Sequence, residues 1–332
     1  MDLHDLISLI DQAIASRRTL IDSTHDSPFR IFNGFSEGYP DLTLEIYART
    51  LVVHNYIKEP AQNQDLVLTI VDHIIKSLKW LRACIVKTRN GLTREERNGI
   101  LVFGEKPDTR VNEHGVWYAI DITLNRDSSF YLDTRNLRKW LIDNMRGKSV
   151  LNTFAYTGSL GVAAIAGGAN LAIQNDRNRQ FLNLAKESCS LNGFTINKKD
   201  FIANDFFPTI AKFKGLGQFF DCVILDPPFF ATTKRGKVDQ EHDSARLINK
   251  VRPLIKDGGY LIAINNALYI NGKEYIQSLE DLCKDGYMQI NTLIPVPEDC
   301  IGYNNTENPI TDPGPFNHST KIVVLNIKRK NL

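Results

Sequence analysis

Residues 149–176, SVLNTFAYTGSLGVAAIAGGANLAIQND, constrain the fold of this chain more than any other stretch. An apolar run ends at Thr153 and Phe154 and leads into a turn around Gly158, after which small and branched residues follow at helical spacing. A Gly-Gly pair then separates this helix from a second apolar run that ends at Asp176. Strand, glycine turn, helix, strand and acid in this order are typical of the first unit of a nucleotide-binding α/β sheet.

The same stretch limits the kind of ligand that such a sheet can hold. Gly158 lets the backbone approach a ligand where a Cβ atom would collide, and Asp176 can accept hydrogen bonds from a ribose diol. The pattern G-x-G-x-x-G, which places a pyrophosphate at a helix N-terminus, is absent from the stretch. We therefore expect a nucleoside ligand without phosphates, and a nicotinamide-dependent oxidoreductase is disfavoured.

Two further acids follow predicted strands. Asp205 comes after a short apolar pair, and Asp226 follows the apolar run 222–225 and opens the sequence DPPFF. Because open α/β sheets bind ligands at the carboxyl ends of their strands, we expect Asp176, Asp205 and Asp226 to lie along one edge.

Three motifs in this order resemble those of the class I S-adenosylmethionine-dependent methyltransferases: YLDTRNLRKW at 131–140, FAYTGSLG at 154–161 and DPPFF at 226–230. They are most similar to the bacterial family that methylates bases of the 23S ribosomal RNA of the large subunit. The resemblance implies S-adenosylmethionine as the cofactor and RNA as the partner. It also implies a Rossmann-like, doubly wound α/β sheet that closes with an antiparallel C-terminal hairpin, formed here by predicted strands at 289–297 and 320–328.

The chain is expected to form two domains. Residues 1–124 combine two amphipathic helices, at 2–16 and 66–78, with several short predicted strands, of which one is expected at 117–124. We interpret them as a small α+β domain. Residues 125–332 form the predicted methyltransferase domain. The family often carries an additional N-terminal RNA-binding module of the PUA type. We expect none here, because the first 124 residues are accounted for by the small domain, to which we assign RNA docking.

Composition excludes several other classes of protein. The hydrophobic content of 42% and charged content of 23% are ordinary for a globular protein, and the net charge of +2 permits RNA binding without requiring it. The five cysteines form no C-x-x-C pair, which predicts reduced thiols and a cytoplasmic protein. No apolar run is long enough to span a membrane, and no cluster of ligands has metal-binding spacing. A homodimer is compatible with the sequence but is not specified by it.

The resemblance assigns the cofactor site residue by residue. Thr157 and Gly158 would face the methionine moiety, Asp176 the ribose and Asp205 the adenine amino group. The full predicted set is Arg135, Phe154, Tyr156, Thr157, Gly158, Asp176, Asp205 and Asp226. Arg135 and Arg138 lie three residues apart on one helical face. They are expected to contact the cofactor carboxylate or an RNA phosphate, and an ion pair with Asp133 between domains is the structural alternative.

The DPPFF motif is the predicted reaction centre. Two prolines stiffen the backbone so that carbonyl groups can face a substrate, and Phe229 offers a face to a base taken out of its stack. The alternative is an ordinary Pro-Pro turn with buried aromatic residues. A buried strand is also predicted at 260–267, and its end carries Asn265 and Asn266. The predicted catalytic residues are Asp226, Pro227, Pro228, Phe229 and Asn265.

Substrate binding is predicted around this centre. A basic segment after DPPFF could hold phosphates, although such a segment is more often a solvated loop, and a surface histidine is the simpler explanation of His318. The predicted set is Arg138, Phe230, Lys234, Arg235, Asn266 and His318.

The position of the cysteines bears on the atom that is methylated. Carbon 5 of cytosine reacts only after a thiolate adds to the ring, and the cytosine-C5 members of the family carry a cysteine where this chain has Asn265 and Asn266. The guanine-N7 members resemble this chain in that Asn pair. We therefore predict a guanine nitrogen of 23S ribosomal RNA as the acceptor, N7 ahead of the exocyclic N2. The alternatives are a cytosine-C5 methyltransferase and a non-catalytic RNA-binding protein that keeps the fold.

Overall fold

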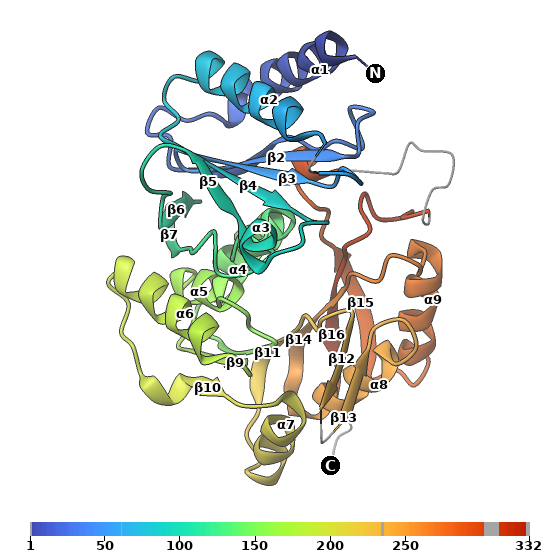
Figure 1. The fold of residues 1–332 in the computed structure, drawn as a ribbon. Coiled ribbons are helices and arrows are strands. Elements are labelled where there is room, and N and C mark those ends of the chain that lie inside the picture. Colours follow the sequence, from blue (N-terminus) through green and yellow to red (C-terminus); the bar gives the residue numbers. More distant parts are fainter. Residues whose placement is uncertain (1, 61, 234–235, 302–311, 330–332) are drawn as a thin grey trace. The chain divides into compact units, whose positions relative to one another are not determined.

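The computed structural model describes residues 2–60, 62–233, 236–301 and 312–329 (Figure 1). The chain divides into two compact units, and each is described here by itself. Among the described residues, unit 1 comprises 2–132 with 297–301, and unit 2 comprises 133–296 with 312–329. The sequence placed this division after residue 124.

The segment after residue 124 belongs to unit 1 because buried polar groups hold it there. The ammonium group of Lys87, on the five-stranded sheet of that unit, donates hydrogen bonds to the carbonyl oxygens of Asn125 (2.8 Å) and Asp127 (3.3 Å). The hydroxyl group of Tyr47 donates to the carbonyl oxygen of Phe130 (3.0 Å). A hydropathy pattern does not report such contacts, and the predicted division therefore fell too early in the chain.

Unit 1 is built on a five-stranded sheet in the order β1-β2-β3-β4-β5. Its strands are β1 (Pro28–Phe32), β2 (Leu42–Tyr47), β3 (Thr50–Asn55), β4 (Ala83–Thr88) and β5 (Ile100–Phe103). The helices are α1 (Leu3–Ser16), α2 (Gln64–Ser77) and the short α3 (Arg94–Asn98), and a separate hairpin consists of β6 (Arg110–Glu113) and β7 (Val116–Ala119). Figure 1 shows α1 and α2 over one face of the sheet, where their apolar stripes close the core of this unit.

Most elements predicted for the first domain are present, with one shortened. The strand expected at 117–124 ends at Ala119. Its continuation is a turn in which the Asp121 carboxylate accepts a hydrogen bond from the backbone N–H of Thr123 (3.1 Å). Aspartate side chains favour such turns because they can bond to the backbone two residues on.

Unit 2 contains a seven-stranded sheet in the order β10-β9-β8-β11-β14-β16-β15. The strands are β8 (Ser149–Thr153), β9 (Leu171–Asp176), β10 (Phe201–Ala203), β11 (Phe220–Leu225), β14 (Ile255–Asn265), β15 (Met288–Leu293) and β16 (Lys321–Ile327). The first five in spatial order are parallel, and β16 is antiparallel to both β14 and β15. The predicted fold class, a doubly wound sheet with an antiparallel ending, is confirmed.

Helices cover both faces of this sheet, as the pattern of the strands requires. They are α4 (Arg135–Asn144), α5 (Ser159–Ala166), α6 (Arg179–Leu191), α7 (Phe206–Gly215), α8 (Ser244–Val251) and α9 (Gly272–Cys283). Successive side chains of β11 alternate between two separate cores: Val223 and Leu225 pack with α7, α8 and α9, while Cys222 and Ile224 pack with α4 and α5. A strand buried on both faces is what a near-continuous apolar run encodes.

Two segments of unit 2 differ from the sequence interpretation. The strand expected from Tyr260 begins at Ile255, since Pro253 limits α8 to the residues before it and the chain extends soon afterwards. The segment after DPPFF, expected as a solvated loop, forms a hairpin of β12 (Phe230–Thr233) and β13 (Gly236–Asp239). Lys234 and Arg235, two of the predicted substrate-binding residues, lie outside the described residues.

Candidate active site

The candidate site is built on the carboxyl ends of four neighbouring parallel strands. The register pairs Thr153 at the end of β8 with both Leu225 of β11 and Asn175 of β9, and it pairs Asp176 with Ala203 of β10. The strand ends are therefore level. The predicted residues that follow them lie along one edge of the sheet, as the order of the acids in the sequence predicted.

The turn after β8 has an unusual backbone that is fixed by the neighbouring strand. Phe154, Tyr156 and Gly158 have φ angles of +54°, +51° and +77°. The N–H of Tyr156 donates to the Asp176 carboxylate (2.9 Å), which ties the turn to the end of β9. Left-handed conformations are uncommon among non-glycine residues as a whole. Those that do occur are concentrated at binding and active sites.

Gly158 is required for a different reason from the one that the sequence suggested. A Cβ atom at this position would lie 2.4 Å from the Cβ of Ala185 in α6, a separation that real atoms do not adopt. Its φ of +77° is also unfavourable for other residues. The structure therefore accounts for this glycine by the close approach of α6 to the turn. Its proximity to a ligand stays a prediction.

Asp176 can serve both the fold and a ribose. One carboxylate oxygen accepts from the N–H of Tyr156, and the other accepts from the N–H of Asn178 (2.8 Å). Each oxygen retains a lone pair, so the group fits a ligand with two adjacent hydroxyl groups. Burial raises its pKa, and the backbone hydrogen bonds and Arg177 oppose that rise. The residues present thus fit the sugar of S-adenosylmethionine.

The next strand end offers an acid and an aromatic surface. Asp205 is the N-cap of α7, where its side chain accepts from the N–H of Phe207 (3.0 Å). The rings of Phe154 and Phe206 are stacked with their centroids 4.6 Å apart. An acceptor beside stacked rings suits a purine with an exocyclic amine. The predicted contact of Asp205 with adenine stays a prediction.

The two arginines of the lead-in motif differ in exposure. Arg138 is fully buried in α4, and its guanidinium donates to the Thr134 hydroxyl (2.7 Å), whereas Arg135 at the start of the helix is half-buried. A phosphate contact by Arg138 would require the guanidinium to leave this environment. Asp133, the expected ion-pair partner, accepts a hydrogen bond from the Thr320 hydroxyl (2.9 Å).

The DPPFF motif lies directly after β11 and contains a perturbed carboxyl group. Burial raises the pKa of Asp226 to about 7, and the nearby carboxylate of Asp133 adds to the rise. Phe229 and Phe230 are 42% and 54% exposed, so the alternative of a turn with buried aromatic residues is wrong. Lys237 of β13 places its ammonium group 5.1 Å from the centroid of the Phe230 ring.

The two residues of the Asn pair, at the end of β14, have different environments. Asn265 is fully buried; its amide nitrogen donates to the carbonyl oxygen of Gln240 (3.2 Å), and its amide oxygen accepts from the N–H of Ala267 (3.0 Å). The side-chain oxygen of Asn266 is buried and has no hydrogen-bond partner among the described residues. Asn265 therefore orders the segment, and Asn266 retains an acceptor for a ligand.

Gln240 and Lys321, which also lie at this edge, carried no signal in the sequence, whereas His318 was one of the predicted substrate-binding residues. Gln240 is almost fully buried and contacts both DPPFF and the Asn pair. Lys321, at the start of β16, donates to the carbonyl oxygens of Ala267 (3.0 Å) and Ser319 (2.6 Å), and burial lowers its pKa to about 8. His318 is half-buried, and its Nδ1 accepts from the N–H of Thr320 (3.0 Å).

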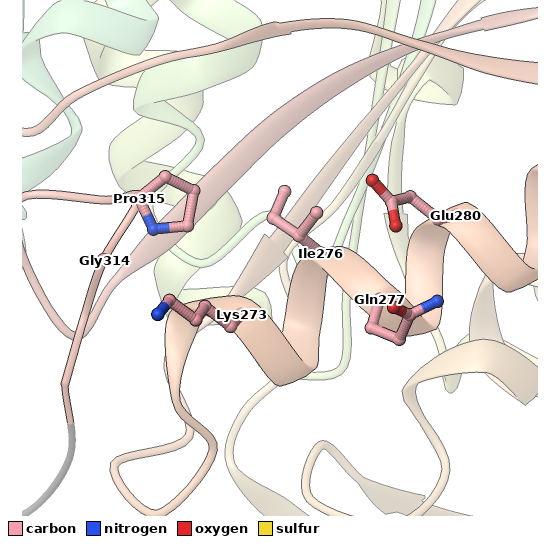
Figure 2. Close-up of a pocket in the computed structure, with 6 residues that line it drawn as sticks. All are labelled: Lys273, Ile276, Gln277, Glu280, Gly314 and Pro315. Carbon is pink, nitrogen blue, oxygen red and sulfur yellow. The ribbon is translucent and has the colours of Figure 1, made fainter.

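A separate pocket lies between α9 and the segment 314–315 (Figure 2). Its lining residues are Lys273, Ile276, Gln277, Glu280, Gly314 and Pro315. None of them belongs to the predicted site. Within the described ranges, the structure contains no cluster of acids, histidines or cysteines that could hold a metal ion, and no helix there is long and apolar enough to cross a membrane.

The strand order of unit 2, with its acids on one edge, defines a class I methyltransferase fold. A model of the S-adenosylmethionine-dependent methyltransferases matches residues 30–285, and the chain belongs to that family. The predictions of family and cofactor are confirmed.

Curated relatives are named for ribosomal RNA. The chain is 32% identical over 238 residues to ribosomal RNA large subunit methyltransferase I of Vibrio cholerae, which covers 70% of this chain and 60% of that protein. It is 31% identical to the protein of the same name from Aeromonas hydrophila, over 70% of this chain and 59% of that protein. The matched region thus spans about three-fifths of these relatives.

A Bacillus subtilis protein named as a candidate ribosomal RNA large subunit methyltransferase is 30% identical, over 83% of this chain and 70% of its own length. Among solved structures, a candidate methyltransferase in complex with SAH has a TM-score of 0.85 at 20% identity. That match covers 98% of this chain and 82% of the other and supports the fold.

Proposed function

We propose that this protein transfers a methyl group from S-adenosylmethionine to a base in the RNA of the large ribosomal subunit, with a guanine nitrogen as the acceptor. The observation that carries the proposal is the DPPFF motif at the carboxyl end of β11, on the same sheet edge as the predicted cofactor-binding residues at the ends of β8, β9 and β10. The names of the relatives support large-subunit ribosomal RNA as the substrate.

Residues of this chain would bind the cofactor along the sheet edge. Asp176 would hold the ribose hydroxyls and Asp205 the adenine amine, while the turn at 154–158 would approach the methionine moiety. When bound, S-adenosylmethionine supplies an electrophilic methyl group. Methyl transfer is an in-line displacement, so the contribution of the protein is largely the orientation of the acceptor and the exclusion of water.

The base would be held between the DPPFF motif and the Asn pair. Phe229 is exposed enough to stack on a base taken out of its helix, and the unpartnered oxygen of Asn266 can accept from the N–H groups of guanine. Methylation at N7 leaves a positive charge on the purine. The ionised Asp226 carboxylate would stabilise that positive charge. Because the pKa of Asp226 is about 7, the stabilisation would depend on pH.

The state of the cysteines supports nitrogen over carbon as the acceptor. Burial raises the pKa of the thiols of Cys84 to about 12 and of Cys189 to about 11, and it raises those of Cys222 and Cys283 as well. Cys300 is buried and belongs to unit 1. No cysteine follows β11 or β14 at the sheet edge, so addition of a thiolate to cytosine has no obvious donor.

Cytosine C5 methylation is the second candidate, because the fold and the DPPFF motif serve that reaction equally well. Nucleoside mass spectrometry of ribosomal RNA from cells with and without the gene separates the two. We expect a methylguanosine to disappear, 7-methylguanosine before N2-methylguanosine. Loss of 5-methylcytidine with unchanged methylguanosines would contradict the guanine assignment and establish the alternative.

A non-catalytic RNA-binding protein on the same fold is separated by calorimetry. Titration of the purified chain with S-adenosylmethionine should release or absorb heat with one site per chain, whereas a fold that has lost its cofactor site would give none.

We also assign RNA docking to unit 1. The guanidinium group of Arg110 lies 4.6 Å from the centroid of the Trp117 ring on the β6–β7 hairpin, and such pairs stack on bases. The cytoplasmic location and the homodimer stay predictions.

A further inference from the structure

Gln240 contacts both segments that would enclose the substrate base. It follows β13 and is 1% exposed. Its side-chain nitrogen donates to the carbonyl oxygen of Pro227, and its backbone N–H donates to the carbonyl oxygen of Phe229 (3.0 Å). Its side-chain oxygen accepts from the N–H of Asn266 (2.7 Å), and its carbonyl oxygen accepts from the amide of Asn265 (3.2 Å). The backbone and side-chain polar groups of Gln240 thus all form hydrogen bonds with two segments that are far apart in the sequence.

The backbone around Gln240 is itself fixed. The β12–β13 hairpin returns the chain from Phe230 to Asp239, which are paired in its register. The Asp239 carboxylate then accepts from the N–H groups of Glu241 (3.2 Å) and His242 (3.1 Å). Asp239 also forms an ion pair with Lys237 (2.7 Å). A turn bonded in this way holds Gln240 in place beside DPPFF.

We propose that Gln240 is a positioning residue that sets the separation between Pro227–Phe229 on one side of the base and Asn265–Asn266 on the other. The inference rests on the proposed function, since it concerns the substrate side of the same site. It also assigns the Pro227 carbonyl to Gln240. The carbonyl oxygen keeps a second lone pair, so Asp226 and the Pro227 carbonyl are both acceptors that the base could meet at this position. A hydrogen-bonded clamp of this kind matters because a displacement of about 1 Å in reacting groups can cost on the order of 100-fold in rate.

Two substitutions of Gln240 distinguish a clamp from simple space filling. Gln240→Ala removes both side-chain bonds. Gln240→Glu keeps the shape, but only the protonated carboxyl group can donate to the Pro227 carbonyl while accepting from the Asn266 N–H. Ionised glutamate has acceptors alone and would face a carbonyl oxygen. Burial favours the protonated form, so the clamp should be restored as the pH falls.

The expected kinetic result is a split between the variants. Gln240→Ala should lower kcat by on the order of 100-fold at every pH, with a smaller change in KM. The rate of Gln240→Glu relative to wild type should rise as the pH falls from 8 to 6. Taking the ratio to wild type at each pH removes the titration of groups common to both proteins, namely Asp226 before the clamp, Asp239 and His242 in its turn and Lys321 on β16.

A matched control is available on α9. Gln277 is exposed, and its side chain bonds only within that helix among the contacts described, to Asp281 (3.2 Å). Gln277→Glu should therefore show the wild-type rate at every pH. If Gln240→Ala retains the wild-type kcat, or if Gln240→Glu follows the pH profile of wild type, Gln240 does not position the site.

Hydrogen exchange tests the clamp without methyl transfer. In Gln240→Ala, the amide of Asn266 should exchange faster, while amides of β9 and the affinity for S-adenosylmethionine stay unchanged. Unchanged exchange at Asn266 would overturn the inference. If wild type transfers no methyl group to any ribosomal RNA, the proposed function fails instead, and the exchange rates alone then decide whether Gln240 holds the two segments.

Discussion

Asp226→Asn should stabilise the protein at neutral and alkaline pH while it lowers methyl transfer. Burial raises the pKa of the Asp226 carboxyl group to about 7 in the folded chain, against 3.8 for an unperturbed aspartate. Burial at the end of β11 is the main cause, and Asp133 adds to it. Asparagine is uncharged at every pH and is close in shape, so the substitution removes the cost of burying the charge.

The magnitude follows from proton linkage. Between pH 4 and pH 7 the folded chain binds this proton and the unfolded chain has released it, so the stability of wild type falls as the pH rises through that window. The difference between a pKa of 3.8 and one of about 7 lowers the free energy of unfolding by about 4 kcal/mol at pH 8, and about 2 kcal/mol of this loss is already present at pH 5. The gain from Asp226→Asn should be near zero below pH 4 and largest above pH 7.

Urea unfolding at pH 5 and pH 8, followed by circular dichroism without cofactor, measures this gain. Asp221 at the other end of β11 supplies the control. Burial would raise its pKa, but hydrogen bonds from Lys256 and Ser149 outweigh that and lower it to about 2. Asp221→Asn should therefore lose stability at both pH values. If the effect of Asp226→Asn is the same at pH 5 and pH 8, the burial of Asp226 does not control its ionisation, and the reasoning is wrong.

The remaining predictions concern three positions. Asp176→Ala should weaken S-adenosylmethionine binding by roughly 1–3 kcal/mol in calorimetry, and an unchanged affinity would remove this residue from the site. Phe229→Ala should lower kcat/KM for RNA through the loss of stacking worth about 1–3 kcal/mol while cofactor affinity stays the same; a fall in cofactor affinity would instead place the ring in the cofactor wall. Gly158→Ala should destabilise the chain by roughly 2–4 kcal/mol in urea unfolding, because its Cβ would overlap Ala185 and its φ is positive; a smaller loss would mean that α6 moves aside at little cost.

The sequence specified the parts of the site that depend on local patterns. Residues 149–176 fold as strand, turn, helix and strand because their apolar spacing changes from continuous to helical and back, and glycine marks each change. The acids at the strand ends followed from the same pattern. Gly158 was identified correctly as a turn residue, but its clash partner, Ala185, lies on another helix and could not be read from the turn itself.

The substrate side depends on contacts between distant segments, and there the sequence was less informative. The hairpin after DPPFF has no clear alternation, since among its described positions only Val238 is buried in the apolar core and only its partner Ala231 packs against that core. Gln240 is one polar residue among several, and its role depends on a hairpin that was not predicted. Asn265 was expected to act on the base, whereas its amide is bonded on both sides within the chain.

The two ends of β11 show how the fold concentrates unfavourable burial at one edge. Asp221 is the second residue of the strand. Its carboxylate accepts hydrogen bonds from Lys256 and Ser149, so its negative charge is stabilised. Asp226 follows the other end, where burial and a like charge oppose ionisation, and Lys321 on the same side of the sheet has its pKa lowered to about 8 by burial. A fold selected for stability alone would gain by replacing both groups. Both groups lie at the carboxyl edge beside the predicted base site and have pKa values close to neutrality. Perturbed pKa values of this kind cluster at functional sites, where stability is given up for reactive or charge-stabilising groups.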